Sequence, residues 1–76
     1  MDWRERIESK PDVLAGKLCL KGTRLSVEHL VGLLAQAWAV ADVLDAYPGL
    51  IGDDLLACLK YAAESVANEQ LFSIEA

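Results

Sequence analysis

The residues best suited to recognising another molecule are two cations, Lys21 and Arg24, which flank the pair Gly22-Thr23. Glycine adopts the positive φ of a tight turn without steric cost, and a threonine hydroxyl in such a turn bonds to nearby backbone. An ammonium and a guanidinium beside the turn suit carboxylates or phosphates, and the guanidinium can form two parallel hydrogen bonds to them. Residues 16–27 therefore predict a positively charged corner that binds an anionic partner.

Side chains that could perform catalysis are few and poorly spaced. His29 is the single histidine, and its neighbour Glu28 would point to a different face of a helix. No serine or cysteine has a positioned base, and no glycine loop has the spacing that cradles a phosphate. We therefore predict a protein that is not an enzyme and that uses no cofactor or metal. Two acidic pairs have spacings typical of helix surfaces and helix first turns: Asp42 with Asp45, and Asp53 with Asp54.

The two cysteines, Cys19 and Cys58, lack the nearby Cys or His residues of a zinc or CxxC redox site. We expect both thiols to be buried as small apolar groups. No apolar run approaches the ~18 residues of a membrane span, and the charged start of the chain, residues 1–6, does not lead into a signal peptide. These features predict a cytoplasmic protein without membrane contact.

Charge is distributed unevenly along the chain, whose net charge is −5. Residues 1–30 carry six cations and five carboxylates, whereas residues 31–76 carry seven carboxylates and a single cation, Lys60. Because DNA phosphates attract cationic surface, any DNA contact is expected from the first third of the chain. The candidates are Lys10, Lys17, Lys21 and Arg24.

The chain of 76 residues is long enough for one domain, and 54% of its residues are hydrophobic. A domain this small buries only ~60% of its unfolded surface. The remaining apolar surface predicts a homodimer or a complex with another protein. The alternative is a monomer with scattered exposed leucines.

Helical spacing of apolar residues predicts three helices, over residues 27–38, 39–47 and 53–67. Ser26 is the expected N-cap of the first helix, and Pro48 ends the second. Each helix has one apolar stripe, so the three should pack together. The residues expected to face inward are Val27, Leu30, Val31, Leu34, Trp38, Val40, Val43, Leu44, Tyr47, Leu55, Leu56, Leu59, Ala63 and Val66.

Short β elements are expected before the helices. Residues 4–8 predict an edge strand, residues 10–12 a turn, and residues 18–20 a second short strand or hairpin arm. Residues 71–74 predict a closing strand. The expected organisation is a single domain over residues 1–76, with a β and turn element at 1–25, a three-helix bundle at 26–67 and a tail or short strand at 68–76. The fold class is mainly α, a helix-turn-helix-like bundle with a small N-terminal hairpin.

Several blocks of the chain resemble domain-of-unknown-function family 433. Residues 15–17 and 21–27 resemble the GGKP.IKGTRI.V core of that family, and residues 43–50 resemble its IL..YP.L segment. Residues 53–64 resemble its EDI.AAL.YAAE helix. The resemblance implies a homeodomain-like helix-turn-helix fold and a kinship with VapB-type antitoxins. It further implies two activities, inhibition of a partner nuclease with a PIN-like domain and binding of operator DNA.

The chain departs from the family pattern where helices begin and end. Leu18 replaces a proline, Ala37 a glycine, Ala39 a Ser or Thr cap, and Ile51 a Thr cap. Each lost cap costs about 1 kcal/mol. Either a partner surface covers residues 37–39 and 51, or the changes are sequence drift.

The PIN-like partner implied by the resemblance has an acidic active site, into which Arg24 could dock. The alternative is a local ion pair between Arg24 and Glu28. Trp38, Tyr61 and Phe72 are candidate interface anchors or core residues. The residues assigned to partner binding are Arg24, Lys21, Trp38 and Ile51.

We therefore expect an antitoxin-like interaction protein that inhibits a nuclease and has DNA binding as a weaker second role. The DNA role is weaker because the third helix, which would normally enter the major groove, begins with Asp53 and Asp54. Two alternatives remain at this point, a stand-alone helix-turn-helix regulator and a structural oligomerisation module.

Overall fold

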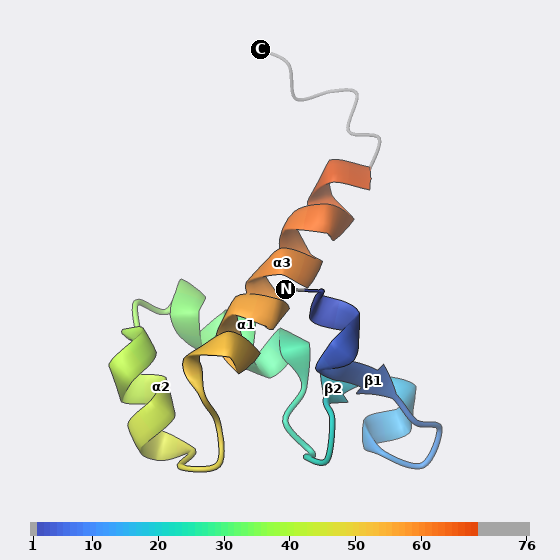
Figure 1. Ribbon diagram of the computed structural model, residues 1–76, viewed down its shortest axis with the longest axis horizontal. Helices are drawn as coiled ribbons and strands as arrows, with labels where there is room; N and C mark the ends of the chain where they lie inside the picture. Colours follow the sequence, from blue (N-terminus) through green and yellow to red (C-terminus); the bar gives the residue numbers. More distant parts are fainter. Residues whose placement is uncertain (1, 69–76) are drawn as a thin grey trace.

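A small antiparallel hairpin and three helices make up the fold in the computed structural model, which describes residues 2–68 (Figure 1). The predicted mainly helical chain with a small N-terminal β element is confirmed. None of the helices in residues 2–68 combines the length and hydropathy that a membrane span needs. The predicted strand at 71–74, and Phe72 within it, lie outside the described residues. The elements in chain order are the 3₁₀ turn η1 (Trp3–Glu5), β1 (Ile7–Ser9), the 3₁₀ turn η2 (Leu14–Gly16), β2 (Leu18–Leu20), α1 (Val27–Ala35), α2 (Val40–Ala46) and α3 (Gly52–Asn68).

The hairpin joins β1 to β2 in a register that pairs Ile7 with Leu20 and Ser9 with Leu18. The prediction of a strand over residues 4–8 was wrong at its start, because residues 3–5 form η1. Asp2 caps this turn: its Oδ1 accepts a hydrogen bond from the Arg4 amide at 3.0 Å. That bond, reinforced by the Arg4 side chain, lowers the pKa of the Asp2 carboxyl.

Helix α1 begins as predicted but ends three residues early. Ser26 caps its start by accepting a hydrogen bond from the His29 amide at 2.9 Å. Its end is a left-handed turn at Ala37, whose φ is 72°. There the Ala37 amide donates to the Leu34 carbonyl (3.0 Å) and the Trp38 amide to the Leu33 carbonyl (3.2 Å). This pair of bonds is the Schellman motif, in which the left-handed residue is usually glycine.

Replacing Ala37 with glycine is therefore expected to raise the free energy of unfolding by about 1 kcal/mol, because the left-handed conformation is costly for alanine. Thermal or urea unfolding would measure the change. The matched control is Ala63→Gly, at an exposed site inside α3, where the same substitution should destabilise by about 1 kcal/mol. A loss of stability in Ala37→Gly would contradict the assignment of strain to this turn.

The two helices that lack a capping side chain, α2 and α3, begin with one half of a capping box. The Ala39 amide donates to Asp42 Oδ2 at 2.9 Å, and the Ile51 amide donates to Asp54 Oδ2 at 2.9 Å. A carboxylate at the third helical position satisfies the N-cap amide and suits the positive end of the helix dipole. These contacts offset part of the cost of the missing Ser or Thr caps.

The core lies between the hairpin and the three helices, and six residues expected to face inward are instead exposed. Both cysteines are buried as predicted, with Cys19 1% and Cys58 0% exposed. Helix α3 turns the face that holds Leu55 and Cys58 inward, which rotates the neighbouring apolar positions toward solvent. Trp38 and Val40 are exposed because they follow the left-handed turn that ends α1. The six exposed residues are Trp38, Val40, Leu56, Leu59, Ala63 and Val66.

Candidate functional site

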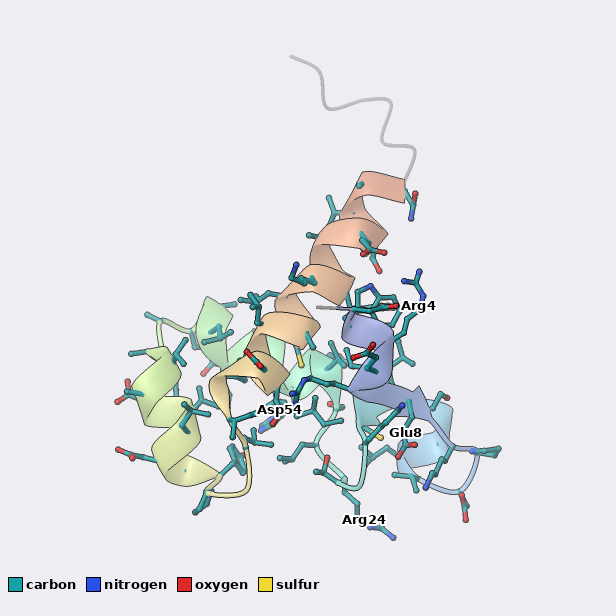
Figure 2. All side chains as sticks on the ribbon, in the orientation of Figure 1. Arg4, Glu8, Arg24 and Asp54 are labelled. Carbon is teal, nitrogen blue, oxygen red and sulfur yellow. The ribbon has the colours of Figure 1, made fainter. Side chains whose placement is uncertain are left out.

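The turn from β2 to α1, residues 21–24, is the corner that the sequence predicts (Figure 2). Gly22 has a φ of +76°, and nothing in the structure lies within 4 Å of the position where a Cβ would be. The positive φ that the sequence suggests at this glycine is therefore present, and backbone conformation rather than crowding favours glycine here.

Hydrogen bonds brace this corner on both sides. Thr23 Oγ1 donates to the Leu20 carbonyl at 2.9 Å and accepts from the Leu25 amide at 3.0 Å, as expected for threonine in a turn. The Gly22 amide donates to Glu8 Oε2 on β1 at 3.2 Å. The corner is therefore attached to both strands of the hairpin and to the start of α1, so its backbone conformation is set before any partner binds.

Both cationic side chains of the corner are accessible to a partner. Lys21 and Arg24 are exposed, and Figure 2 shows the Arg24 side chain projecting from the body. Neither forms an ion pair with any residue in the range 2–68. The alternative ion pair between Arg24 and Glu28 does not form. Glu28 instead pairs with Lys17, with 3.1 Å between Nζ and Oε1.

The other two cations assigned to DNA binding differ from those of the corner. Lys10 pairs with Glu8, with 3.6 Å between Nζ and Oε2, and Lys17 pairs with Glu28. Both lysines are exposed, so each pair is worth about 1 kcal/mol. Each nonetheless places a carboxylate beside a lysine that would have to meet a phosphate. The structure thus divides the predicted set of four into two paired lysines and the two cations of the corner.

The remaining predicted partner-binding residues lie on other connections. Trp38 is 39% exposed between α1 and α2, and Ile51 is 52% exposed between α2 and α3. Tyr61 is half-buried and packs edge-on against Trp3, with ring centroids 5.0 Å apart. His29 Nε2 lies 3.0 Å from the Tyr47 hydroxyl, so the histidine links α1 to the end of α2. No three His, Cys, Asp or Glu side chains in residues 2–68 gather where they could hold a metal ion.

Sequence reasoning missed the ion pair between Arg6 and Asp54. Arg6 Nη1 lies 3.0 Å from Asp54 Oδ1, and Arg6 Nη2 lies 3.7 Å from Asp53 Oδ2. Asp54 therefore both binds Arg6 and caps the start of α3, because its other oxygen, Oδ2, accepts a hydrogen bond from the Ile51 amide. The sequence assigns the acidic first turn of α3 to the helix dipole and to repulsion of DNA, and does not indicate a partner at Arg6. A carboxylate at the third position of a helix is a local signal that predicts the hydrogen bond to the Ile51 amide, but not the ion pair with Arg6.

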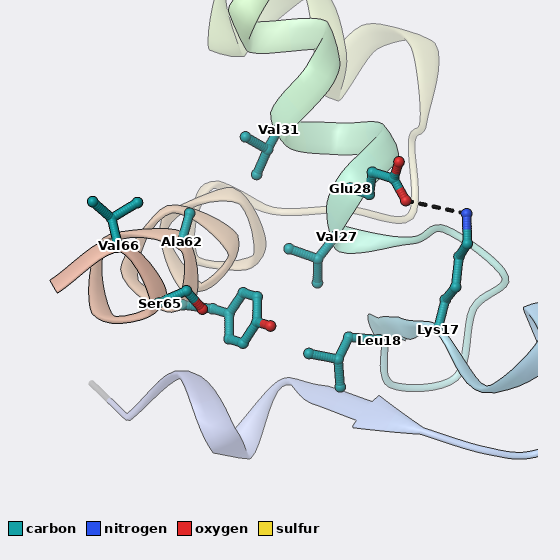
Figure 3. Close-up of a pocket in the computed structure, with 9 residues that line it drawn as sticks. Lys17, Leu18, Val27, Glu28, Val31, Ala62, Ser65 and Val66 are labelled. Carbon is teal, nitrogen blue, oxygen red and sulfur yellow. Dashed lines mark hydrogen bonds and ion pairs between the residues drawn. The ribbon is translucent and has the colours of Figure 1, made fainter. Parts of the chain in front are cut away.

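A groove of about 410 Å³ opens between β2, α1 and the C-terminal half of α3 (Figure 3). Its walls are mainly apolar and include Leu18, Val27, Val31 and Tyr61. The Lys17–Glu28 pair stands at one end, where the dashed line in Figure 3 joins the two side chains. The groove holds no cluster of catalytic groups.

Comparison with known proteins places the chain in a family. The family model described as "Protein of unknown function (DUF433)" matches residues 7–62. A crystal structure of a DUF433 member protein from Anabaena variabilis is 31% identical to the chain and superposes with a TM-score of 0.76. The match covers 82% of this chain but 61% of the other, so the chain spans less than two-thirds of that protein. None of the curated proteins compared with the chain matches it. The extent of the family match shows that the chain belongs to the DUF433 family.

Proposed function

We propose that the chain is an antitoxin-like interaction protein that binds the acidic active site of a PIN-type nuclease through Lys21 and Arg24. One observation carries the proposal. Residues 1–30 contain six cations, and four of them, Arg4, Arg6, Lys10 and Lys17, form ion pairs within the part of the chain that the structure describes. The two that do not are the two on the braced corner.

The corner suits a cluster of carboxylates. A guanidinium binds a carboxylate through two parallel hydrogen bonds, and Lys21 adds a second positive charge a few residues away. Because the turn is held by Thr23, Gly22 and Glu8, little backbone order has to be gained on binding. A guanidinium placed in the acidic cluster would neutralise the carboxylates on which the nuclease depends, which is how binding would inhibit it.

Operator binding through a helix-turn-helix formed by α2 and α3 is the weaker part of this proposal. Helix α3 begins with Asp53 and Asp54, which would face phosphates. Lys10 and Lys17 would also have to leave Glu8 and Glu28 to reach DNA. Such binding would weaken steeply as salt is raised. If DNA from the promoter of the gene gives no gel shift at low salt, operator binding is excluded.

The test of nuclease binding uses the full chain and the acidic-cluster nuclease encoded next to it, with affinity measured by calorimetry or surface plasmon resonance. Arg24→Ala is expected to weaken binding by about tenfold or more, as loss of an arginine anchor does. Lys21→Ala should weaken it by about threefold to tenfold.

The matched control is Lys10→Ala, which removes an exposed lysine already paired with Glu8 and should change the affinity by less than about twofold. Equal affinity in wild type and Arg24→Ala would end the proposal, as would a neighbouring gene whose product lacks an acidic cluster.

A further inference from the structure

Helix α3 carries an exposed stripe of apolar and small residues, whose last member, Val66, also lines the groove beside α1 and β2. Leu56, Leu59 and Val66 are 45%, 41% and 59% exposed, and Gly52 and Ala63 are also exposed. Successive members are four, three, four and three residues apart. This spacing averages 3.5 residues, the repeat that forms the contact seam of a coiled coil. We call these five residues the α3 stripe.

The position of α3 leaves room for another helix. Figure 1 shows that its C-terminal half extends beyond the other elements. The core takes up the other side of the helix, where Ala57 and Cys58 are buried, and Leu55 is buried at the edge of the stripe, beside Leu59. The five residues of the α3 stripe are exposed in both halves of the helix, so a second helix could lie along them.

We propose that the α3 stripe binds the same stripe of a second copy of the chain, with the two helices antiparallel. A two-fold axis between Leu56 and Leu59 would place Leu56 against the partner's Leu59 at the centre. The same axis would place Gly52 against the partner's Ala63, where the small side chains let the helices approach closely. The surface is then self-complementary, as a two-fold dimer interface must be.

Charges beside the stripe select this arrangement. Lys60 and Asp53 lie along one edge of the stripe, one position after Leu59 and Gly52 respectively. In the antiparallel pair Lys60 meets the partner's Asp53, and Asp53 meets the partner's Lys60, because equivalent edges face each other. Lys60 forms no ion pair with residues 2–68, and the Asp53 side chain is 59% exposed with its one ion pair at 3.7 Å.

Other ways of pairing the helices lose this complementarity. A shift that brings Leu56 to the partner's Val66 would bring Lys60 close to the partner's Lys60. A parallel pair would place Lys60 beside the partner's Leu55 or the partner's Ala62, where it meets no carboxylate. An interface of one helix from each copy should bury less than the ~800 Å² per partner of a standard complex, so we expect a dissociation constant of about 10–100 μM.

Sedimentation equilibrium of the full chain, from about 10 μM to about 1 mM, brackets that expected constant. The wild-type mass should rise from 8.3 kDa toward twice that value. Leu56→Glu puts a charge at the centre of the seam and should weaken association by more than about tenfold. Leu56 is 45% exposed, so the fold should survive, and circular dichroism would verify this.

A charge exchange tests the register. Lys60→Asp places two carboxylates together at each end of the contact and should weaken association by about fivefold or more. Adding Asp53→Lys to the same chain should restore it to within about twofold of wild type. Glu64→Gln, a charge change on the same helix outside the stripe, is the control and should leave association unchanged.

Wild-type protein that stays monomeric over the whole range would overturn the proposal and leave the α3 stripe to a different protein. A dimer that survives Leu56→Glu, or that the charge exchange fails to restore, would overturn it too. The experiment contains no nuclease, so its outcome is independent of the function proposed for the 21–24 corner.

Discussion

Replacing Asp54 with alanine is expected to lower the free energy of unfolding by about 2–3 kcal/mol. The substitution removes the acceptor of the Ile51 amide, which is worth about 1 kcal/mol as a helix cap. It also leaves the half-buried Arg6 guanidinium with only Asp53, 3.7 Å away. A hydrogen bond to a charged group contributes about 1.5–3 kcal/mol when buried, and partial exposure of Arg6 reduces this. For a domain of this size the melting temperature should fall by about 10–20 °C.

Asp53→Ala is the matched control, because Asp53 is the neighbouring carboxylate on the same helix and its side chain is 59% exposed. We expect it to cost less than about 0.5 kcal/mol. Urea unfolding of dilute protein would measure both variants. A double-mutant cycle with Arg6→Ala should give a coupling energy of about 1 kcal/mol or more between Arg6 and Asp54. Equal stabilities of the Asp54→Ala and Asp53→Ala proteins would show that the ion pair and cap contribute nothing.

Stability is expected to fall by about 2 kcal/mol between pH 9 and pH 11 because of one buried thiol. Burial raises the pKa of Cys58 from 9.0 to about 11, and the nearby negative charge of Asp54 adds to the effect. Above pH 9 the unfolded chain releases this proton while the folded chain keeps it. The unfolded state then binds fewer protons, so the free energy of unfolding decreases as pH rises, with a slope of up to about 1.4 kcal/mol per pH unit.

Below pH 9 both states hold the proton, and this contribution is constant. Urea unfolding at several pH values would measure the slope for wild type and for Cys58→Ala. All other side chains are the same in both proteins, so the difference between the two slopes isolates the thiol. Cys58→Ala is itself expected to lower stability at neutral pH through lost packing, but its alkaline slope should be shallower. Identical slopes would contradict a raised pKa at Cys58.

Local signals account for the parts of the fold that could be predicted from the sequence. Ser26 caps α1, Gly22 has a positive φ, and Pro48 follows the end of α2, because each depends on residues only a few positions away. The end of α1 was placed too late because Ala37 occupies a position that glycine usually marks. With alanine there, the sequence contains no visible signal for the left-handed turn.

Contacts between distant residues could not be predicted. Arg6 and Asp54 are 48 positions apart, and nothing near either residue indicates its partner. The orientation of α3 was also ambiguous, because Leu55, Leu56 and Leu59 form an apolar arc wider than the core can cover. Packing of Leu55 and Cys58 decides which side is buried. At the candidate site, Lys21 and Arg24 were found from the turn alone, while the neutralisation of Lys10 and Lys17 required the fold.

The contacts of the first six residues limit how far the domain can be truncated at its N-terminus. The DUF433 match begins at residue 7, yet Trp3 packs edge-on against Tyr61 and Arg6 binds the start of α3, both from outside the matched range. A fragment trimmed to residues 7–62 would keep the part that matches the family but lose these contacts between the N-terminal segment and α3. The folding unit is thus longer than the family boundary, and amino-terminal fusions need a spacer that leaves Trp3 free to dock.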